Sequence, residues 1–277
     1  MRIEMAKSYG FCFGVKRAIK IAESAGEAST IGELIHNAEE INRLKQNFGV
    51  KTLKDASEVG DESKLIIRTH GIQKEDLQSL QARGKELIDA TCPFVTKPQQ
   101  IVEKMSDEGY DIVIFGDANH PEVKGVKSYA KGRVFVVLEP HELANIKLGS
   151  KVAAVSQTTK KIENFMKIVD FLVQKSREVR IFNTICNATL ENQEAAAELA
   201  KKADIMIVVG GKNSSNTKQL FLISQNFCKD CYLIENENEL EASWFEGKEL
   251  CGISAGASTP DWIIKKVVAK IEEITKI

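Results

Sequence analysis

Short apolar runs recur along the chain and are separated by longer stretches in which apolar and polar residues follow a helical period. The clearest runs are rich in Ile and Val and cover residues 64–67, 112–115, 134–138, 151–155 and 205–209. Short β-branched runs between amphipathic helices are typical of βαβ units, in which helices cover a mostly parallel sheet. The pattern therefore predicts an α/β fold class.

This pattern repeats three times, and each repeat opens with a cysteine. The segments Cys12-Phe-Gly-Val-Lys-Arg, Cys92-Pro-Phe-Val-Thr-Lys and Cys186-Asn-Ala-Thr-Leu-Glu each begin a helical stretch. Internal repeats of this kind predict similar structural units. We therefore expect three similar α/β lobes, residues 13–91, 92–185 and 186–277. Residues 1–12 must supply to the last lobe the strand that the other two carry before their next cysteine.

Polar residues gather just after the predicted strands. Open α/β sheets bind ligands outside the carboxyl ends of their strands, beside helix N-termini that favour anions. Three lobes that face a common centre would bring these residues and the three thiols together. The polar ring consists of His36, His70, His120, Thr158, Ser214, Ser215, Asn216 and Ser258.

The charge balance excludes whole classes of partner. The 277 residues include 38 Lys and Arg and 39 Asp and Glu, a net charge of −1, so the chain has no global basic field for nucleic acid or anionic lipid. The longest stretch without these four residue types is eleven residues, 250–260, whereas a membrane-spanning helix needs about 20 apolar residues. The N-terminus lacks the apolar run of a signal peptide. We expect a cytoplasmic protein that binds neither nucleic acid nor membrane.

The six cysteines indicate chemistry or burial and not a disulfide framework, because cytosolic thiols stay reduced. Cys12, Cys92 and Cys186 each begin a helix, where the ionised thiolate that a metal requires is favoured. Three thiolates suit a 4Fe-4S cluster with one iron left without a protein ligand. Zinc is the competing metal, although a structural zinc site made only of cysteines usually has four. For any one of these cysteines alone, burial as a small apolar group is the alternative.

The other three cysteines give weaker signals. Cys228-Lys-Asp-Cys231 has the spacing of a redox dithiol or of half a zinc site. It has no counterpart in the other repeats, precedes a strand and lacks a second pair, so we interpret it as structural. Cys251 lies within an apolar run and is expected in the core.

Hydroxyl, amide and imidazole groups at helix starts suit a phosphate or diphosphate held by many hydrogen bonds. Plain helix capping is the alternative for each Ser or Thr, and Ser258-Thr259-Pro260 fits an N-cap. His141 lies in an acidic stretch and is expected at the surface. Gly210-Gly-Lys-Asn-Ser lacks the GxxxxGK[ST] pattern, so nucleotide hydrolysis is not supported.

Nine segments together resemble the 4-hydroxy-3-methylbut-2-enyl diphosphate reductases, and they span nearly the whole chain in one order. They are Gly10-Phe-Cys12-Phe-Gly-Val-Lys-Arg-Ala, His36-Asn37, Arg68-Thr-His70-Gly71, Asp89-Ala-Thr-Cys92-Pro, His120-Pro-Glu122-Val, Ser156-Gln-Thr158-Thr159, Cys186-Asn-Ala-Thr, Lys212-Asn-Ser214-Ser215-Asn216-Thr and Ala255-Gly-Ala-Ser258-Thr-Pro-Asp. The Cys228/Cys231 pair is not a feature of this family.

The resemblance implies a trefoil of three lobes around a central, oxygen-sensitive 4Fe-4S cluster held by Cys12, Cys92 and Cys186. Exposure to air would convert such a cluster to a 3Fe-4S form or remove it. The implied reaction is the two-electron reductive dehydroxylation of an allylic diphosphate to isopentenyl and dimethylallyl diphosphate, which is the last step of the methylerythritol phosphate route. A ferredoxin or flavodoxin would supply the electrons singly.

The resemblance also implies roles for individual residues. Glu122 is the expected proton donor, helped by Thr158 and His120. The expected diphosphate ligands are His36, His70, His120, Ser214, Ser215, Asn216 and Ser258.

Two other functions fit parts of the sequence. One is an iron-sulfur sensor or binding protein in which the polar ring is incidental. The other is a zinc hydrolase of a phosphorylated metabolite that uses His120 and Glu122 to activate water. Substrate-dependent electron consumption separates the reductase from a sensor, and metal analysis separates it from a zinc enzyme.

Overall fold

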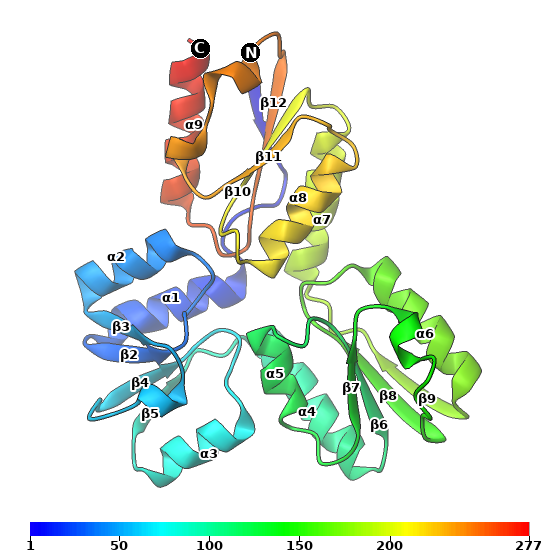
Figure 1. Cartoon of the computed structure of the whole chain (residues 1–277). Coiled ribbons are helices and arrows are strands. Elements are labelled where there is room, and N and C mark those ends of the chain that lie inside the picture. The colour runs from blue at the N-terminus through cyan, green and yellow to red at the C-terminus, as the bar shows by residue number, and fades with distance from the viewer. Residues whose placement is uncertain (277) are drawn as a thin grey trace. The chain divides into compact units, whose positions relative to one another are not determined.

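The computed structural model describes residues 1–276, and in this range it contains three four-stranded parallel sheets flanked by helices (Figure 1). This confirms the predicted fold class of three α/β lobes. We call the sheets I, II and III in the order in which their cysteines occur in the chain.

Sheet I has the strand order β3-β2-β4-β5, and all its pairs are parallel. Its strands are β2 (Ala28–Ile31), β3 (Val50–Leu53), β4 (Lys64–Ile67) and β5 (Glu86–Asp89). The helices of this part of the chain are α1 (Phe13–Ala25), α2 (Ala38–Phe48) and α3 (Lys74–Ala82). Leu80 of α3 packs against Ile31, Leu65 and Ile67 of the sheet.

Sheet II repeats this arrangement with the strand order β7-β6-β8-β9. Its strands are β6 (Asp111–Phe115), β7 (Val134–Val137), β8 (Lys151–Ser156) and β9 (Glu178–Phe182), and its helices are α4 (Pro93–Asp107), α5 (Pro121–Lys127) and α6 (Ile162–Lys175). Apolar residues of α4 and α5 pack with Ile112 and Ile114, whereas Phe165 of α6 stacks on Phe115. Alternate residues of β6 therefore pack against the helices on opposite faces of the sheet, as expected for a strand buried on both faces.

Sheet III has the order β11-β10-β12-β1. Its strands are β10 (Ile205–Val209), β11 (Cys231–Ile234), β12 (Leu250–Ala255) and β1 (Arg2–Met5), and its helices are α7 (Asn187–Ala200), α8 (Ser215–Gln225) and α9 (Asp261–Thr275). The N-terminal strand β1 pairs in parallel with β12 and so takes the place that β5 and β9 have in the other sheets. The predicted lobe boundaries at residues 91/92 and 185/186 stay predictions.

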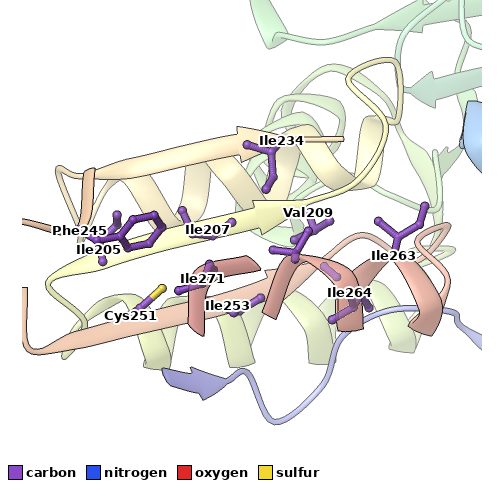
Figure 2. Close-up of a cluster of buried hydrophobic side chains, with 12 residues drawn as sticks. Ile205, Ile207, Val209, Ile234, Phe245, Cys251, Ile253, Ile263, Ile264 and Ile271 are labelled. Atoms are coloured by element: carbon purple, nitrogen blue, oxygen red, sulfur yellow. The ribbon is translucent and has the colours of Figure 1, made fainter. Parts of the chain in front are cut away.

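The core of sheet III shows how period-2 burial builds such a lobe. Ile205, Ile207 and Val209 of β10 point to α9, where they meet Ile263, Ile264, Val267 and Ile271 (Figure 2). Met206 and Val208 point to the opposite face and pack against α7 and α8. Burying an Ile or Val side chain contributes about 1.5–3 kcal/mol each, so these layers hold the strand ends in place.

The chain packs as two compact units, and we describe each by itself. One comprises Met1–Lys16, Ile35–Arg43 and Asn187–Ile277, and the other comprises Arg17–Leu34 and Leu44–Cys186. Sheet III belongs to the first unit, and sheets I and II belong to the second. Within residues 1–276 no helix combines the length and the hydropathy needed to span a bilayer.

Each sheet has one switch point, where the chain leaves a central strand (β2, β6 or β10) for a neighbour on one side and later returns to the other side. These switch points lie between β2 and β4, between β6 and β8, and between β10 and β12. In α/β sheets, ligands bind in the crevice outside the carboxyl ends of the strands at such points. The polar segments singled out in the sequence follow these strands.

Candidate active site

The three repeat cysteines occupy the same position in the three lobes. Each directly precedes the first residue of a helix, α1, α4 or α7. The backbone N–H of each cysteine donates to a backbone carbonyl: Cys12 to Ala257 at 3.3 Å, Cys92 to Thr69 at 3.0 Å and Cys186 to Thr158 at 3.0 Å. Every acceptor lies two residues after the end of a strand: Ala257 after β12, Thr69 after β4 and Thr158 after β8. The thiols are half-buried, so the lobes present them at helix N-termini without enclosing them.

Their donor set fits a thiolate-bound metal. A helix N-terminus favours the ionised form of a nearby thiol, because the N–H groups and the helix dipole point positive charge at it. Cys228, Cys231 and Cys251 are different, since all three are buried among apolar side chains. Burial raises the pKa of both Cys231 and Cys251 to about 12, which keeps these thiols protonated. The structural interpretation of the Cys228/Cys231 pair and the core position of Cys251 agree with this burial.

Glu122 lies at the switch point of sheet II, in the first turn of α5, and only 1% of it is exposed. The backbone N–H and the hydroxyl of Thr158 each donate to its carboxylate at 2.7 Å. Desolvation raises the pKa of Glu122 above its ordinary value, although the hydrogen bonds from Thr158 and the charge of Lys160 oppose the shift. The carboxyl group therefore retains a proton to higher pH than an exposed Glu does.

Thr158 links this carboxyl group to a cysteine. Its N–H and hydroxyl donate hydrogen bonds to Glu122, while its carbonyl accepts the hydrogen bond from the N–H of Cys186. A second connection is made by buried Gln157, which accepts from the N–H of Asp117 at 3.0 Å and donates to Thr159 at 3.2 Å. The loops after β6 and β8 are thus tied together at the switch point.

His120 and His70 meet in the same unit. His120 is the N-cap of α5, and its Nδ1 accepts from the N–H of Glu122 at 3.2 Å, which leaves Nε2 as the ring's hydrogen-bond donor. The two imidazoles contact edge to face with centroids 5.3 Å apart. The turn that carries His70 continues to α3, where the N–H of Lys74 donates to the hydroxyl of Ser128. The structure therefore brings His70, His120, Glu122 and Thr158 together.

The other unit brings together the remaining ring residues at the switch point of sheet III. Ser214 is the N-cap of α8 and accepts from the N–H of Thr217 at 3.3 Å. Asn216 is only 4% exposed, and neither its amide oxygen nor its amide nitrogen has a hydrogen-bond partner among residues 1–276. A buried amide without a partner is costly, and a ligand is one way to satisfy it.

His36 and Ser258 complete this second group. The hydroxyl of Ser258 donates to the carbonyl of His36 at 3.1 Å. The same carbonyl lies close to Gly211, where a Cβ atom would stand 2.5 Å away, so only glycine admits this approach. The N-cap interpretation of Ser258 is wrong, because the N-cap of α9 is Pro260. For Ser214 the helix-capping alternative is correct, because Ser214 is the N-cap of α8.

Two further polar residues at the switch points had no role in the sequence interpretation. Gln157 was part of a recognised segment, and its sequence signal is an amide at the end of an apolar strand. Arg68 was also part of such a segment, and its signal is a cation between an apolar strand and the His70 turn. His141 lies exposed, as expected.

Comparisons with known proteins cover almost the whole chain. The model of the family described as LytB protein matches residues 3–272. A 4-hydroxy-3-methylbut-2-enyl diphosphate reductase of Campylobacter hominis is 74% identical over 271 residues, which is 98% of this chain and 98% of the relative. Another protein of that name, from Campylobacter lari, is 66% identical over the full length of both chains.

Two solved structures are similar as well. One is an (E)-4-hydroxy-3-methyl-but-2-enyl diphosphate reductase described as the terminal enzyme of the non-mevalonate pathway. It is 42% identical, covers 98% of this chain and 99% of its own, and has a TM-score of 0.72. The other is an E-1-hydroxy-2-methyl-but-2-enyl-4-diphosphate reductase of Plasmodium falciparum, 28% identical with a TM-score of 0.91, covering 98% of this chain and 87% of its own.

Proposed function

The chain belongs to the LytB protein family, and we propose that it carries out the reaction for which its relatives are named. It is an oxidoreductase that converts (E)-4-hydroxy-3-methylbut-2-enyl diphosphate to isopentenyl diphosphate and dimethylallyl diphosphate. This is the last step of the methylerythritol phosphate route to isoprenoids. The reaction takes up two electrons and two protons, breaks one C–O bond and releases one water.

Cys12, Cys92 and Cys186 would hold a 4Fe-4S cluster. The support is their identical backbone hydrogen bond and their place before a helix in each lobe. Three ligands leave one iron open, and a cluster bound there would pass electrons singly and act as a Lewis acid for the allylic hydroxyl. A lone zinc ion could not supply the electrons of the reduction for which the relatives are named, which disfavours the zinc hydrolase.

Glu122 would supply the proton that turns the leaving hydroxide into water. Its burial and raised pKa support this role, because a general acid must still carry its proton near neutral pH. Thr158 would orient the carboxyl group through its two hydrogen bonds, and its rotatable hydroxyl can pass a proton between Glu122 and the substrate. His120 would hold the first turn of α5 through Nδ1 and direct Nε2–H to the substrate.

The polar ring would bind the diphosphate. His36, His70, His120, Ser214, Ser215, Asn216 and Ser258 are its proposed ligands. Ser214 accepts one hydrogen bond as an N-cap and keeps its hydroxyl proton for a donor role. Ser258 would have to turn its hydroxyl from the carbonyl of His36 to a phosphate oxygen. The partners are thus a small-molecule substrate and a reductant, for which we propose a ferredoxin or flavodoxin. The cytoplasmic location stays a prediction.

The observation that carries the proposal is the matched position of the three cysteines, and replacing each with serine tests it. After anaerobic reconstitution, Cys12→Ser, Cys92→Ser and Cys186→Ser should each lose most bound iron and sulfide and all measurable reduction of the allylic diphosphate. Iron, sulfide and substrate-dependent oxidation of a reduced dye are the measurements.

Cys228→Ser is the matched control. The thiol of Cys228 is buried and its pKa is raised, so replacing it should leave the cluster intact. The assignment fails if Cys186→Ser keeps its iron while Cys228→Ser loses it. A cluster-loaded wild type that consumes no electrons when substrate is added would instead support the sensor.

A further inference from the structure

The switch point of sheet I holds a half-buried arginine in the turn that carries one of the ring histidines. Arg68 directly follows β4, and its Nε donates to the carbonyl of Gly71 at 3.3 Å. The backbone N–H of Gly71 donates in return to the carbonyl of Arg68 at 3.0 Å. The turn that carries His70 is therefore closed both by its backbone and by the side chain of Arg68.

The loop after β2 leaves room for this guanidinium. Gly32 has φ +75°, and a Cβ atom there would lie 2.2 Å from Nη1 and 2.7 Å from Cζ of Arg68. The guanidinium thus occupies the space that a side chain at position 32 would need. The N–H and the hydroxyl of Thr69 both donate to the carbonyl of Leu34, at 3.3 and 2.8 Å, and join the two loops.

Thr69 also connects this arrangement to a cysteine, because its carbonyl accepts the hydrogen bond from Cys92. Arg68, His70 and Cys92 thus depend on one short segment, residues 68–71, at the carboxyl end of a central strand. A displacement of Arg68 would move the imidazole that is expected to bind the substrate.

The charge of Arg68 has a physical consequence of its own. Burial lowers the pKa of Arg68 and the carboxylate of Glu33 opposes the shift, but a guanidinium remains protonated at any physiological pH. A cation partly removed from water acts on nearby charges more strongly than an exposed one. The diphosphate ligands proposed above are imidazoles, hydroxyls and an amide, which carry no fixed charge.

We propose that Arg68 is a positioning residue of the diphosphate site, seated in the space left by Gly32. It holds the His70 turn in the binding geometry and offsets part of the negative charge of the substrate. This inference rests on the proposed function and adds a fixed cation to its otherwise neutral anion site.

Arg68→Gln tests the contribution of the positive charge. Arg68→Lys keeps the charge and tests the contribution of the planar guanidinium. With cluster-loaded protein, Arg68→Gln should raise KM for the allylic diphosphate about tenfold and change kcat by less than about twofold. The affinity for inorganic diphosphate, measured by anaerobic calorimetry, should fall by a similar factor. Arg68→Lys should recover part of this affinity because it keeps the charge.

Gly32→Ala tests the same contact from the other side, because the added methyl group collides with the guanidinium. It should weaken diphosphate binding in the same direction as Arg68→Gln. Gly26→Ala is the matched control, since Gly26 has φ +69° and nothing lies within 4 Å of its Cβ position. It carries the same backbone strain without the collision and should bind diphosphate like the wild type.

Several results would overturn the inference. Unchanged diphosphate affinity in Arg68→Gln or in Gly32→Ala would remove Arg68 from the site, and a loss that Gly26→Ala shares would assign the effect to strain. Equal losses in Arg68→Lys and Arg68→Gln would refute the charge contribution. If Arg68→Gln does not fold, the diphosphate affinities of Gly32→Ala and Arg68→Lys still test the role of Arg68. A wild type that binds diphosphate but fails to reduce the allylic diphosphate would contradict the proposed function and leave the role of Arg68 in diphosphate binding standing.

Discussion

The switch points of sheets II and III place a buried polar side chain at the same position in different surroundings. Glu122 is the second residue of α5, which follows β6, and Asn216 is the second residue of α8, which follows β10. Both side chains are almost completely buried. An N-cap side chain, His120 or Ser214, precedes each of them by two residues.

The difference lies in the neighbouring loop. Two residues after β8 stands Thr158, which gives Glu122 two hydrogen bonds. The residue at the same place after β12 is Ala257, whose methyl group can give none. Ala257 thus lacks the hydroxyl that supplies one of the two bonds to Glu122, and the side chain of Asn216 has no hydrogen-bond partner within the described part of the chain.

One repeated fold thus supplies two kinds of polar group. At sheet II the protein satisfies its own carboxyl group and sets its pKa, which suits proton transfer. At sheet III it leaves an amide unsatisfied, which suits a ligand with hydrogen-bonding oxygens. Three predictions test this contrast, besides the experiments on the cysteines and Arg68.

The largest effect is expected for Glu122→Gln. Glutamine keeps the size and can still accept a hydrogen bond from Thr158, but it cannot donate an acidic proton. Turnover should fall on the order of 10²- to 10⁴-fold, while cluster content and substrate affinity stay near wild type. Anaerobic kinetics with a saturating electron donor measure this. Near-normal turnover would leave Glu122 as a helix-terminal carboxylate, worth about 0.3–1 kcal/mol to the helix.

A smaller effect is expected for Asn216→Ala. Losing hydrogen bonds to a charged ligand should weaken binding of the allylic diphosphate about ten- to a hundredfold. The ligand-free protein should be no less stable, because the change removes a buried amide whose lack of partners costs about 1–3 kcal/mol. Calorimetry and urea unfolding report the two quantities. A large stability loss with unchanged affinity would make Asn216 a structural residue and end the contrast.

The smallest effect concerns pH. Because the pKa of Glu122 is raised in the folded protein, the folded state retains a proton that the unfolded state releases above the ordinary value of 4.5. Wild-type stability, compared with that of Glu122→Gln, should therefore fall as the pH rises from 4.5 through the raised pKa. Parallel urea titrations of both cluster-loaded proteins from pH 5 upward measure the difference. A difference that grows in the opposite direction would mean that the carboxylate is stabilised by its hydrogen bonds.

The amino-acid sequence determined the local features of this protein. Apolar runs of β-branched residues predicted the strands, because that pattern depends on residues close together in the chain. The recurrence of the same pattern after each of three cysteines predicted three similar lobes. The parallel sheets and the family confirm the expected fold class and the resemblance. The polar loops could be located for the same reason, since each directly follows a predicted strand.

Only the tertiary structure decided what those polar residues do within the protein. The sequence did not show that Glu122 is buried against Thr158, which is 36 residues away, or that Ser258 bonds to His36 instead of capping α9. It also gave no sign that Gly32 makes room for Arg68. Burial, pKa shifts and unsatisfied amides arise when strands and loops distant in the chain are packed side by side, and a pattern of local periodicity does not contain these distances.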